Sequence, residues 1–145
     1  MVSAVCRRDI QRAAVDKRHP DGGAYRSLAR EEAAFLSRRH QLAVRDIEIE
    51  ALSMEIVPEP YVRNLNTFSL ADQRCLLTKT AAVVGLGGLG GVVVEILARI
   101  GVGTLTVIDG DVFDSSNLNR PQFSRVGNLG GSKAVAAAER VGEIN

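Results

Sequence analysis

The chain has 145 residues, of which 46% are hydrophobic and 24% are charged. This length fits one ordinary domain, or a small domain preceded by an arm, and the composition is that of a globular protein. No apolar run approaches the roughly 20 residues that a membrane span requires. The N-terminal stretch also lacks the apolar segment of a secretory signal. We therefore expect a cytoplasmic protein with no membrane attachment.

The net charge of +1 hides an uneven distribution. Residues 1–45 carry ten Lys and Arg against five Asp and Glu, whereas residues 46–145 carry eight against twelve. A basic segment can contact nucleic acid, and Arg38, Arg39 and Arg45 would be the contact residues of such a module. An excess this small is more typical of a solvated helical face. Nucleic acid is therefore an alternative partner and not the one we expect.

The two cysteines, Cys6 and Cys75, lie far apart in the sequence and belong to no CxxC motif. The two histidines of the chain are isolated as well. This pattern favours neither a zinc site nor a disulfide framework. We expect ordinary thiols and no residues that bind a metal directly within this chain.

Residues 24–56 have the pattern of two short helices. In the first, Ser27 is placed to cap the opening turn, and Leu28, Phe35 and Leu36 fall on one side. The second helix places four apolar residues at helical spacing: Val44, Ile47, Ala51 and Met54. Two such helices could form a helix-turn-helix, but nothing in the pattern specifies one.

Two prolines, Pro58 and Pro60, end the helical pattern and suggest a boundary. We therefore expect residues 1–56 to form a helical N-terminal arm and residues 57–78 to be a linker. Residues 79–145 would then form the principal domain.

From residue 79 the sequence predicts alternating strands and helices. The predicted elements are strand 79–85, helix 88–100, strand 104–108 and a last helix from residue 132. The first strand reads as a Val-rich buried parallel strand. Strands that alternate with helices in this way build parallel sheets. We expect an α/β fold, a partial Rossmann-like doubly wound sheet preceded by a small helical segment.

Between the first strand and its helix lies a Gly-x-Gly-x-x-Gly turn. Gly85 allows the tight turn, Gly87 lets the backbone approach a phosphate, and Gly90 lets the helix pack closely on the strand. The helix N-terminus favours an anion. Asp109 follows Gly90 by nineteen residues and is placed to accept hydrogen bonds from ribose hydroxyls. These features predict a nucleotide site but do not choose between a dinucleotide and ATP.

A polar loop at residues 109–123, "DGDVFDSSNLNRPQF", favours ATP. It is longer than the ordinary connection of about 4–6 residues. Arg120 offers a planar fork for phosphate oxygens, and Asn117 can bond a nucleotide or the backbone. Lys133 begins the last helix, where its charge opposes the helix dipole unless an anion is near. That helix has Ser132 as its expected cap and Ala134, Ala138 and Val141 as its expected inner face. An NAD- or FAD-dependent oxidoreductase remains an alternative, although it leaves both cations unexplained.

Three segments, "VVGLGGLGG", "VIDGDVFDSSNLNR" and "GGSKAVAAAERVGEIN", together resemble the ThiF/MoeB/HesA family, bacterial relatives of ubiquitin-activating enzymes. The resemblance covers residues 61–145 and includes a Lys thirteen residues past the Arg of the NLxR segment. It implies ATP-dependent adenylylation of the C-terminal glycine of a ubiquitin-like modifier or sulfur-carrier protein that ends in Gly-Gly. The implied cofactors are ATP and Mg²⁺, and the implied assembly is a homodimer.

The resemblance also implies roles for individual residues. Arg63, in "YVRN", would reach the ATP of the partner subunit, while Arg120 and Lys133 would act on the phosphates in their own chain. The implied nucleotide-binding positions are Gly85, Gly87, Gly88, Gly90, Asp109, Asp111, Ser116, Asn117 and Asn119. Asp111 can contact metal or water, or it can be a plain loop residue.

Two departures from the family pattern stand out. Pro121 separates Arg120 from Gln122, whereas the family commonly has Gln directly after the Arg. The chain also ends at Asn145, ahead of the family's metal-binding Asp, any catalytic Cys and any zinc motifs. We therefore expect an N-terminal fragment that does not catalyse adenylylation alone.

Overall fold

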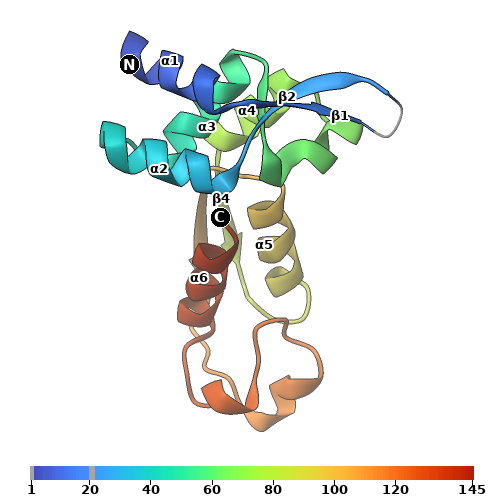
Figure 1. The fold of residues 1–145 in the computed structure, drawn as a ribbon. Coiled ribbons are helices and arrows are strands. Elements are labelled where there is room, and N and C mark those ends of the chain that lie inside the picture. Colours follow the sequence, from blue (N-terminus) through green and yellow to red (C-terminus); the bar gives the residue numbers. More distant parts are fainter. Residues whose placement is uncertain (1, 20–21) are drawn as a thin grey trace. The chain divides into compact units, whose positions relative to one another are not determined.

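The computed structural model describes residues 2–19 and 22–145, and it divides the chain into two compact units. The first unit is Met1–Leu77 and the second is Thr78–Asn145. Figure 1 shows the order of the elements in both. In the described residues, no helix combines the length and the apolar character needed to cross a membrane.

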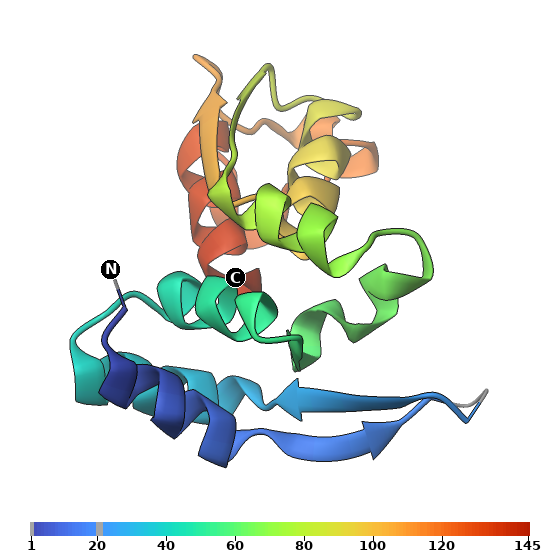
Figure 2. The same cartoon turned by 90° about the horizontal axis from the view of Figure 1, so that it is seen from above.

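The first unit combines helices with a three-stranded sheet. Strand β1 (Val15–Arg18) runs antiparallel to β2 (Ala24–Leu28), and β2 runs parallel to β3 (Ile56–Pro58). Figure 2 shows β1 and β2 side by side. The helical elements are α1 (Ala4–Ala13), α2 (Arg30–His40), α3 (Val44–Ser53), the 3-10 helix η1 (Glu59–Asn66) and α4 (Leu70–Thr78). The segment expected as a linker therefore contains β3, η1 and α4.

The expectation that residues 24–28 are helical was wrong. They form β2, and the Ser27 hydroxyl donates to the carbonyl of Val57 at 3.1 Å across the sheet, so Ser27 caps no helix. Helix α2 begins after Ala29, which offers no side-chain cap. Pairing with β3, thirty residues further along the chain, outweighs the local helical pattern.

The two predicted helices are present as α2 and α3, although Val44 is 37% exposed and Met54 follows the end of α3. Leu36 is buried in α2, and Ile47 and Ala51 are buried in α3. Phe35, which was expected on the inner face, is instead 48% exposed. The principal core of this unit consists of Cys6, Ile10, Leu28, Ala33, Leu36, Ile47, Ala51 and Ile56.

The second unit is a parallel strand pair with helices on one face. Its elements are β4 (Thr80–Val84), α5 (Gly90–Arg99), β5 (Thr104–Ile108), the 3-10 helices η2 (Ser115–Asn119) and η3 (Val126–Asn128), and α6 (Lys133–Ile144). These match the predicted strands and helices closely. Strand β4 is parallel to β5, and Val84 pairs with Ile108. The buried core residues come from α5, α6, the glycine turn and the loop after β5: Leu86, Val94, Phe113, Phe123, Ala136 and Ala137. Val83, Leu105 and Val107 of the strands are partly buried against them.

The two strands are buried on one face only, which corrects the expectation of fully buried strands. Val84 is 76% exposed and Ile108 is 50% exposed. The inner face of α6 also differs by one position: Ala136 and Ala137 are buried, whereas Ala138 is exposed. Ser132 caps α6 as predicted, because its Oγ accepts from the N–H of Val135.

Candidate functional site

The glycine turn joins β4 to α5 and depends on two of its glycines. Gly85 has a φ of +86° and donates its N–H to the carbonyl of Ile108 at 2.8 Å. A Cβ on Gly90 would lie 1.8 Å from the Gly85 carbonyl oxygen, so only glycine fits there. A Cβ on Gly87 would meet nothing within 4 Å. The turn is therefore tightly packed where Gly90 meets Gly85 and open at Gly87. Gly87 lies next to the N-terminus of the helix, which attracts anions.

Asp109 follows β5 and connects the glycine turn to the loop after β5 through hydrogen bonds. One carboxylate oxygen accepts from the N–H of Leu86 at 2.5 Å, and the other accepts from the N–H of Asp111 at 2.8 Å. Partial burial alone would raise the pKa of Asp109. The two N–H donors and the charge of Lys133 outweigh burial and lower that pKa. Asp109 therefore stays ionised and holds two segments of the site together.

Lys133 begins α6 and is held by the same loop. Its Nζ lies 3.0 Å from Asp111 Oδ2, and its N–H donates to the Asp111 carbonyl. An isolated bridge between Val112 and Ser132 extends this connection. The Lys133 side chain is buried. Hydrogen bonds from Ser116 are the largest cause of the lowered pKa of Asp114, and the charge of Lys133 lowers it further. The anion that a lysine at this helix end requires is thus supplied by aspartate side chains in the structure.

The polar loop folds on itself around Asn117. Asp114 caps η2 by accepting from the N–H of Ser116 at 2.6 Å, while the buried Asn117 accepts from the N–H of Asp114 at 3.3 Å. Ser124 Oγ donates to the carbonyls of Asn117 and Pro121. The bonds that the structure shows for Ser116 and Asn117 are therefore internal to the loop. They shape the segment from which Arg120 projects.

Arg120, which the sequence suggested as a phosphate ligand, lies next to the glycine turn, and its role stays a prediction. A Cβ on Gly88 would be 3.7 Å from the Arg120 Cβ and 3.8 Å from its Cγ and Cδ. The guanidinium contacts Asn119 Oδ1 at 3.5 Å and the residue is exposed. The loop thus brings a solvent-accessible cation to the side of the turn that carries Gly88.

Sequence reasoning missed the close approach of this loop to the start of α5. A Cβ on Gly91 would lie 2.9 Å from the Gln122 Cβ and 3.3 Å from a ring carbon of Phe123. Gly91 therefore lets the loop lie directly on the helix. The signal was present as a second glycine directly after Gly90, which the dinucleotide-turn pattern does not require.

Arg63 lies in η1 of the first unit, which two polar contacts anchor. Tyr61 OH donates to Glu48 at 3.3 Å, and Asn64 Nδ2 donates to Gln73 at 2.9 Å. Burial raises the pKa of Glu48, and the Tyr61 hydrogen bond and the charge of Arg30 act in the opposite direction. A role for Arg63 with a nucleotide remains a prediction.

The second unit therefore places a glycine turn, an acidic strand end and two cations at the same edge of a parallel strand pair, which defines a Rossmann-like α/β domain. The profile of the ThiF family matches residues 61–145. This chain belongs to the ThiF family.

Named relatives agree with this assignment. The chain is 42% identical over 78 residues to adenylyltransferase and sulfurtransferase UBA4 of Yarrowia lipolytica, covering 54% of this chain and 19% of that protein. It is 38% identical over 102 residues to ubiquitin-like modifier-activating enzyme 5 of Caenorhabditis briggsae, covering 68% of this chain and 23% of that protein. The chain thus spans about a fifth of the length of these relatives.

Among solved structures, the chain resembles the E. coli tRNA N6-threonylcarbamoyladenosine dehydratase TcdA in complex with ATP. The TM-score is 0.58 and the identity is 32%, over 60% of this chain and 36% of that one. The relative is thus an ATP-bound protein with the same fold over the matched part.

Proposed function

We propose that this chain supplies the ATP-binding part of an enzyme that adenylylates the C-terminal glycine of a ubiquitin-like modifier or sulfur-carrier protein. One observation carries the proposal: two cations lie close to the glycine turn. Arg120 lies next to Gly88 of the turn. Lys133 pairs with Asp111, whose N–H donates to Asp109. Relatives named as an adenylyltransferase and as a modifier-activating enzyme support it, as does an ATP-bound structural neighbour.

In the proposed reaction, a carboxylate oxygen of the terminal glycine attacks the α-phosphorus of ATP. A carboxylate–phosphorus bond forms, and the bond from that phosphorus to the bridging oxygen breaks, so its electron pair leaves with pyrophosphate. The nucleophile is already ionised, and no general base is needed. Catalysis is therefore positioning and charge neutralisation by the α5 N-terminus, Arg120 and Lys133. Asp109 would keep the turn in place and face the ribose.

Magnesium enters the proposal with ATP, and we assign none of the described residues as its ligand. They contain no group of three or more His, Cys, Asp or Glu side chains that could hold a metal ion. The nearby carboxylates of Asp109 and Asp111 are engaged by backbone N–H groups and by Lys133. We assign no step of the reaction to a metal held by these residues.

A nucleotide titration tests the choice of ligand. We expect the chain to bind ATP, with magnesium chloride present, at least about tenfold more tightly than NAD, because cations beside the turn favour a triphosphate. Isothermal titration with each nucleotide measures both. Tighter binding of NAD than of ATP would overturn the proposal and favour the oxidoreductase alternative.

The acceptor needs a separate test. In a protein that carries the full length of the relatives, candidate carriers should stimulate exchange of labelled pyrophosphate into ATP. The matched control is the same carrier without its terminal Gly-Gly, which should give no exchange. Stimulation that survives the truncation would refute the C-terminal glycine as acceptor.

Arg63 is proposed to act in a two-fold homodimer, on the ATP of the other subunit. An Arg63→Ala protein mixed with a Lys133→Ala protein should then recover part of the exchange activity, because one hybrid site keeps both cations. Each variant alone is the control. Absence of recovery, with subunit exchange demonstrated by tagged copies, would place Arg63 outside the partner's site.

A further inference from the structure

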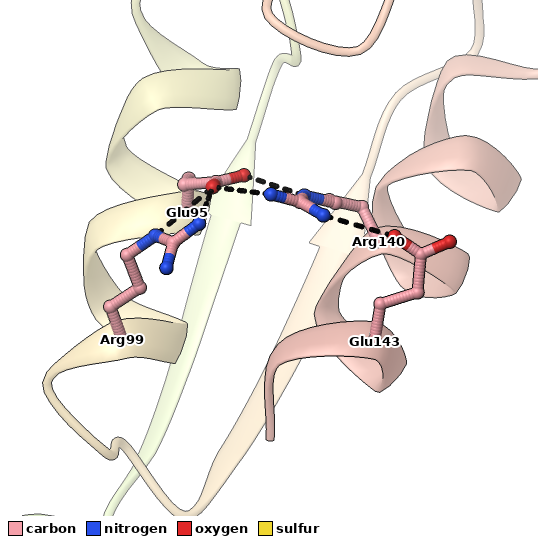
Figure 3. A network of polar contacts seen from close by, with 4 residues as sticks. All are labelled: Glu95, Arg99, Arg140 and Glu143. Carbon is pink, nitrogen blue, oxygen red and sulfur yellow. Dashed lines mark hydrogen bonds and ion pairs between the residues drawn. The ribbon is translucent and has the colours of Figure 1, made fainter. Parts of the chain in front are cut away.

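An ion-pair network joins α5 to α6 on the side of the second unit shown in Figure 3. Arg140 on α6 uses two nitrogens on the Glu95 carboxylate of α5, with Nε 3.1 Å from Oε2 and Nη2 3.0 Å from Oε1. Such a two-point contact fixes orientation as well as distance. The side chain of Glu95 is only 13% exposed, so water screens the contact incompletely.

The two helices that this pair joins both begin at the candidate nucleotide site. Helix α5 starts at Gly90, directly after the glycine turn, and α6 starts at Lys133. Any slide or rotation of one helix along the other therefore changes the distance between the turn's N–H groups and the Lys133 ammonium. Both groups must reach one string of phosphates in the proposed function.

The apolar packing between the two helices uses small side chains. The buried residues on their facing sides are small, Val94 on α5 and Ala136 and Ala137 on α6. Small side chains give shallow ridges and grooves, so a directional polar contact adds to the definition of the register. Asn145 at the end of α6 also donates from Nδ2 to the Ala98 carbonyl of α5, at a longer 3.4 Å. A cavity of about 230 Å³ also lies between the helices and the loop that follows Arg120. Its walls include Glu95, Arg140, Ala136, Gln122 and Phe123, so side chains do not fill the space beside the pair.

We propose that Glu95 and Arg140 are positioning residues that set the register of α5 against α6 and thereby the spacing between the glycine turn and Lys133. The proposal rests on the proposed ATP-binding function. In this proposal, neither Glu95 nor Arg140 touches the nucleotide. The loop at Gln122 and Phe123 lies on Gly91 and forms part of the cavity wall, so it would transmit the same shift to Arg120.

The network contains its own control residues. Arg99 binds Glu95 within α5, and Glu143 binds Arg140 within α6. Neither contact crosses between the helices, as Figure 3 shows. Removing either charge perturbs the same carboxylate or guanidinium without breaking the bridge. A register role therefore predicts sensitivity at Glu95 and Arg140 and tolerance at Arg99 and Glu143.

The experiment measures the Kd of this chain for ATP with magnesium chloride, together with thermal melting and circular dichroism. We expect Glu95→Gln and Arg140→Gln each to weaken binding about tenfold, because a displacement near 1 Å is enough to cost that much. Arg99→Gln and Glu143→Gln should stay within about twofold of the unsubstituted chain. Arg140→Lys, which keeps the charge without the planar fork, should be intermediate.

Exchanging the charges supplies a readout that a purely structural role would not move. Glu95→Arg combined with Arg140→Glu is made in a chain that already carries Arg99→Gln and Glu143→Gln, since otherwise the new charges would face like charges. We expect this exchange to bring the Kd to within about threefold of that background. The single changes Glu95→Arg or Arg140→Glu in the same background should weaken binding most.

The outcomes separate this proposal from the proposed function. If the unsubstituted chain binds no ATP, the proposed function fails and the register role fails with it. If it binds ATP and folded Arg140→Gln or Arg140→Lys binds equally well, the register role alone is refuted. A fall in melting temperature with unchanged Kd would likewise show that the pair only stabilises the fold.

Discussion

The ammonium of Lys133 lies 3.0 Å from the carboxylate of Asp111, and the two side chains differ sharply in exposure. Lys133 is 9% exposed and Asp111 is 75% exposed. The cation is therefore held in place by its surroundings, whereas the carboxylate sits at the surface and can turn away. An incoming phosphate could take the position of the Asp111 carboxylate beside Lys133 without uncovering a buried charge.

Asp111→Asn should therefore weaken the fold and increase the effect of ATP on it. We expect the variant to lose about 1 kcal/mol of stability, because the buried cation loses a partner that is itself exposed. Added ATP should raise its melting temperature more than that of the unsubstituted chain. The matched control is Asp16→Asn, which removes a 91% exposed partner of Arg26 and should change little. Equal melting temperatures for Asp111→Asn and the unsubstituted chain would contradict this account.

Gly90→Ala should disrupt the turn. The new methyl group would lie 1.8 Å from the Gly85 carbonyl oxygen, so the helix must move away from the strand. We expect a loss of about 3 kcal/mol or more, the range of overpacking and backbone strain. Denaturant unfolding measures it. Gly110→Ala is the control, because a Cβ there meets nothing within 4 Å, and a similar loss in that variant would show that the effect is not specific to the turn.

Asp109→Asn should make the second unit less stable at neutral pH, with a difference that fades in acid. The pKa of Asp109 is lowered in the fold, so its contribution is complete above the ordinary carboxyl pKa of about 3.9 and is lost as pH falls through the lower value. Melting temperatures of both proteins between pH 7 and pH 3 should therefore converge at the acid end. A constant difference across this range would remove the ionised carboxylate as the cause.

Glu48→Gln should have the opposite dependence in the first unit. Burial raises the pKa of Glu48, so its ionisation opposes folding, and stability falls as pH rises through the raised pKa. The amide can still accept from Tyr61. We expect Glu48→Gln to gain about 1 kcal/mol at pH 8, and the gain should vanish near pH 4. Tyr61→Phe tests the contact itself. A Glu48→Gln protein that is less stable at pH 8 would mean that the charge is favourable there.

Sequence patterns predicted the second unit well because its signals are local. The glycine turn, the apolar strands and the capping Ser132 are each predicted by patterns that span only a few residues. Gly85, Asp109, Arg120 and Lys133 were chosen as candidate site residues from the same local patterns, and their roles stay predictions. The links between them could not be read in this way. The bond from Leu86 to Asp109 and the pair of Asp111 with Lys133 both join positions more than twenty residues apart.

The first unit shows more clearly what local sequence patterns fail to predict. Residues 24–28 follow a helical pattern, but they pair as a strand with β1 and β3 on either side. The local sequence does not predict these strand partners. The Glu95–Arg140 pair was missed for a related reason. Each residue reads as an ordinary charge on a helix, and only the packing of α5 against α6 brings them together.

The pairing of Val84 with Ile108 restricts which changes in length the gene can tolerate. Gly85 and Asp109 are the next positions on the two parallel strands, so they stay aligned only while the register of both strands is kept. One codon gained or lost within β4 or β5 would move the aspartate by about 3.3 Å and turn it to the opposite face of the sheet. In-frame insertions should therefore survive only in the connections, such as residues 101–103 between α5 and β5. During divergence, the lengths of both strands must therefore be kept together with the glycine turn.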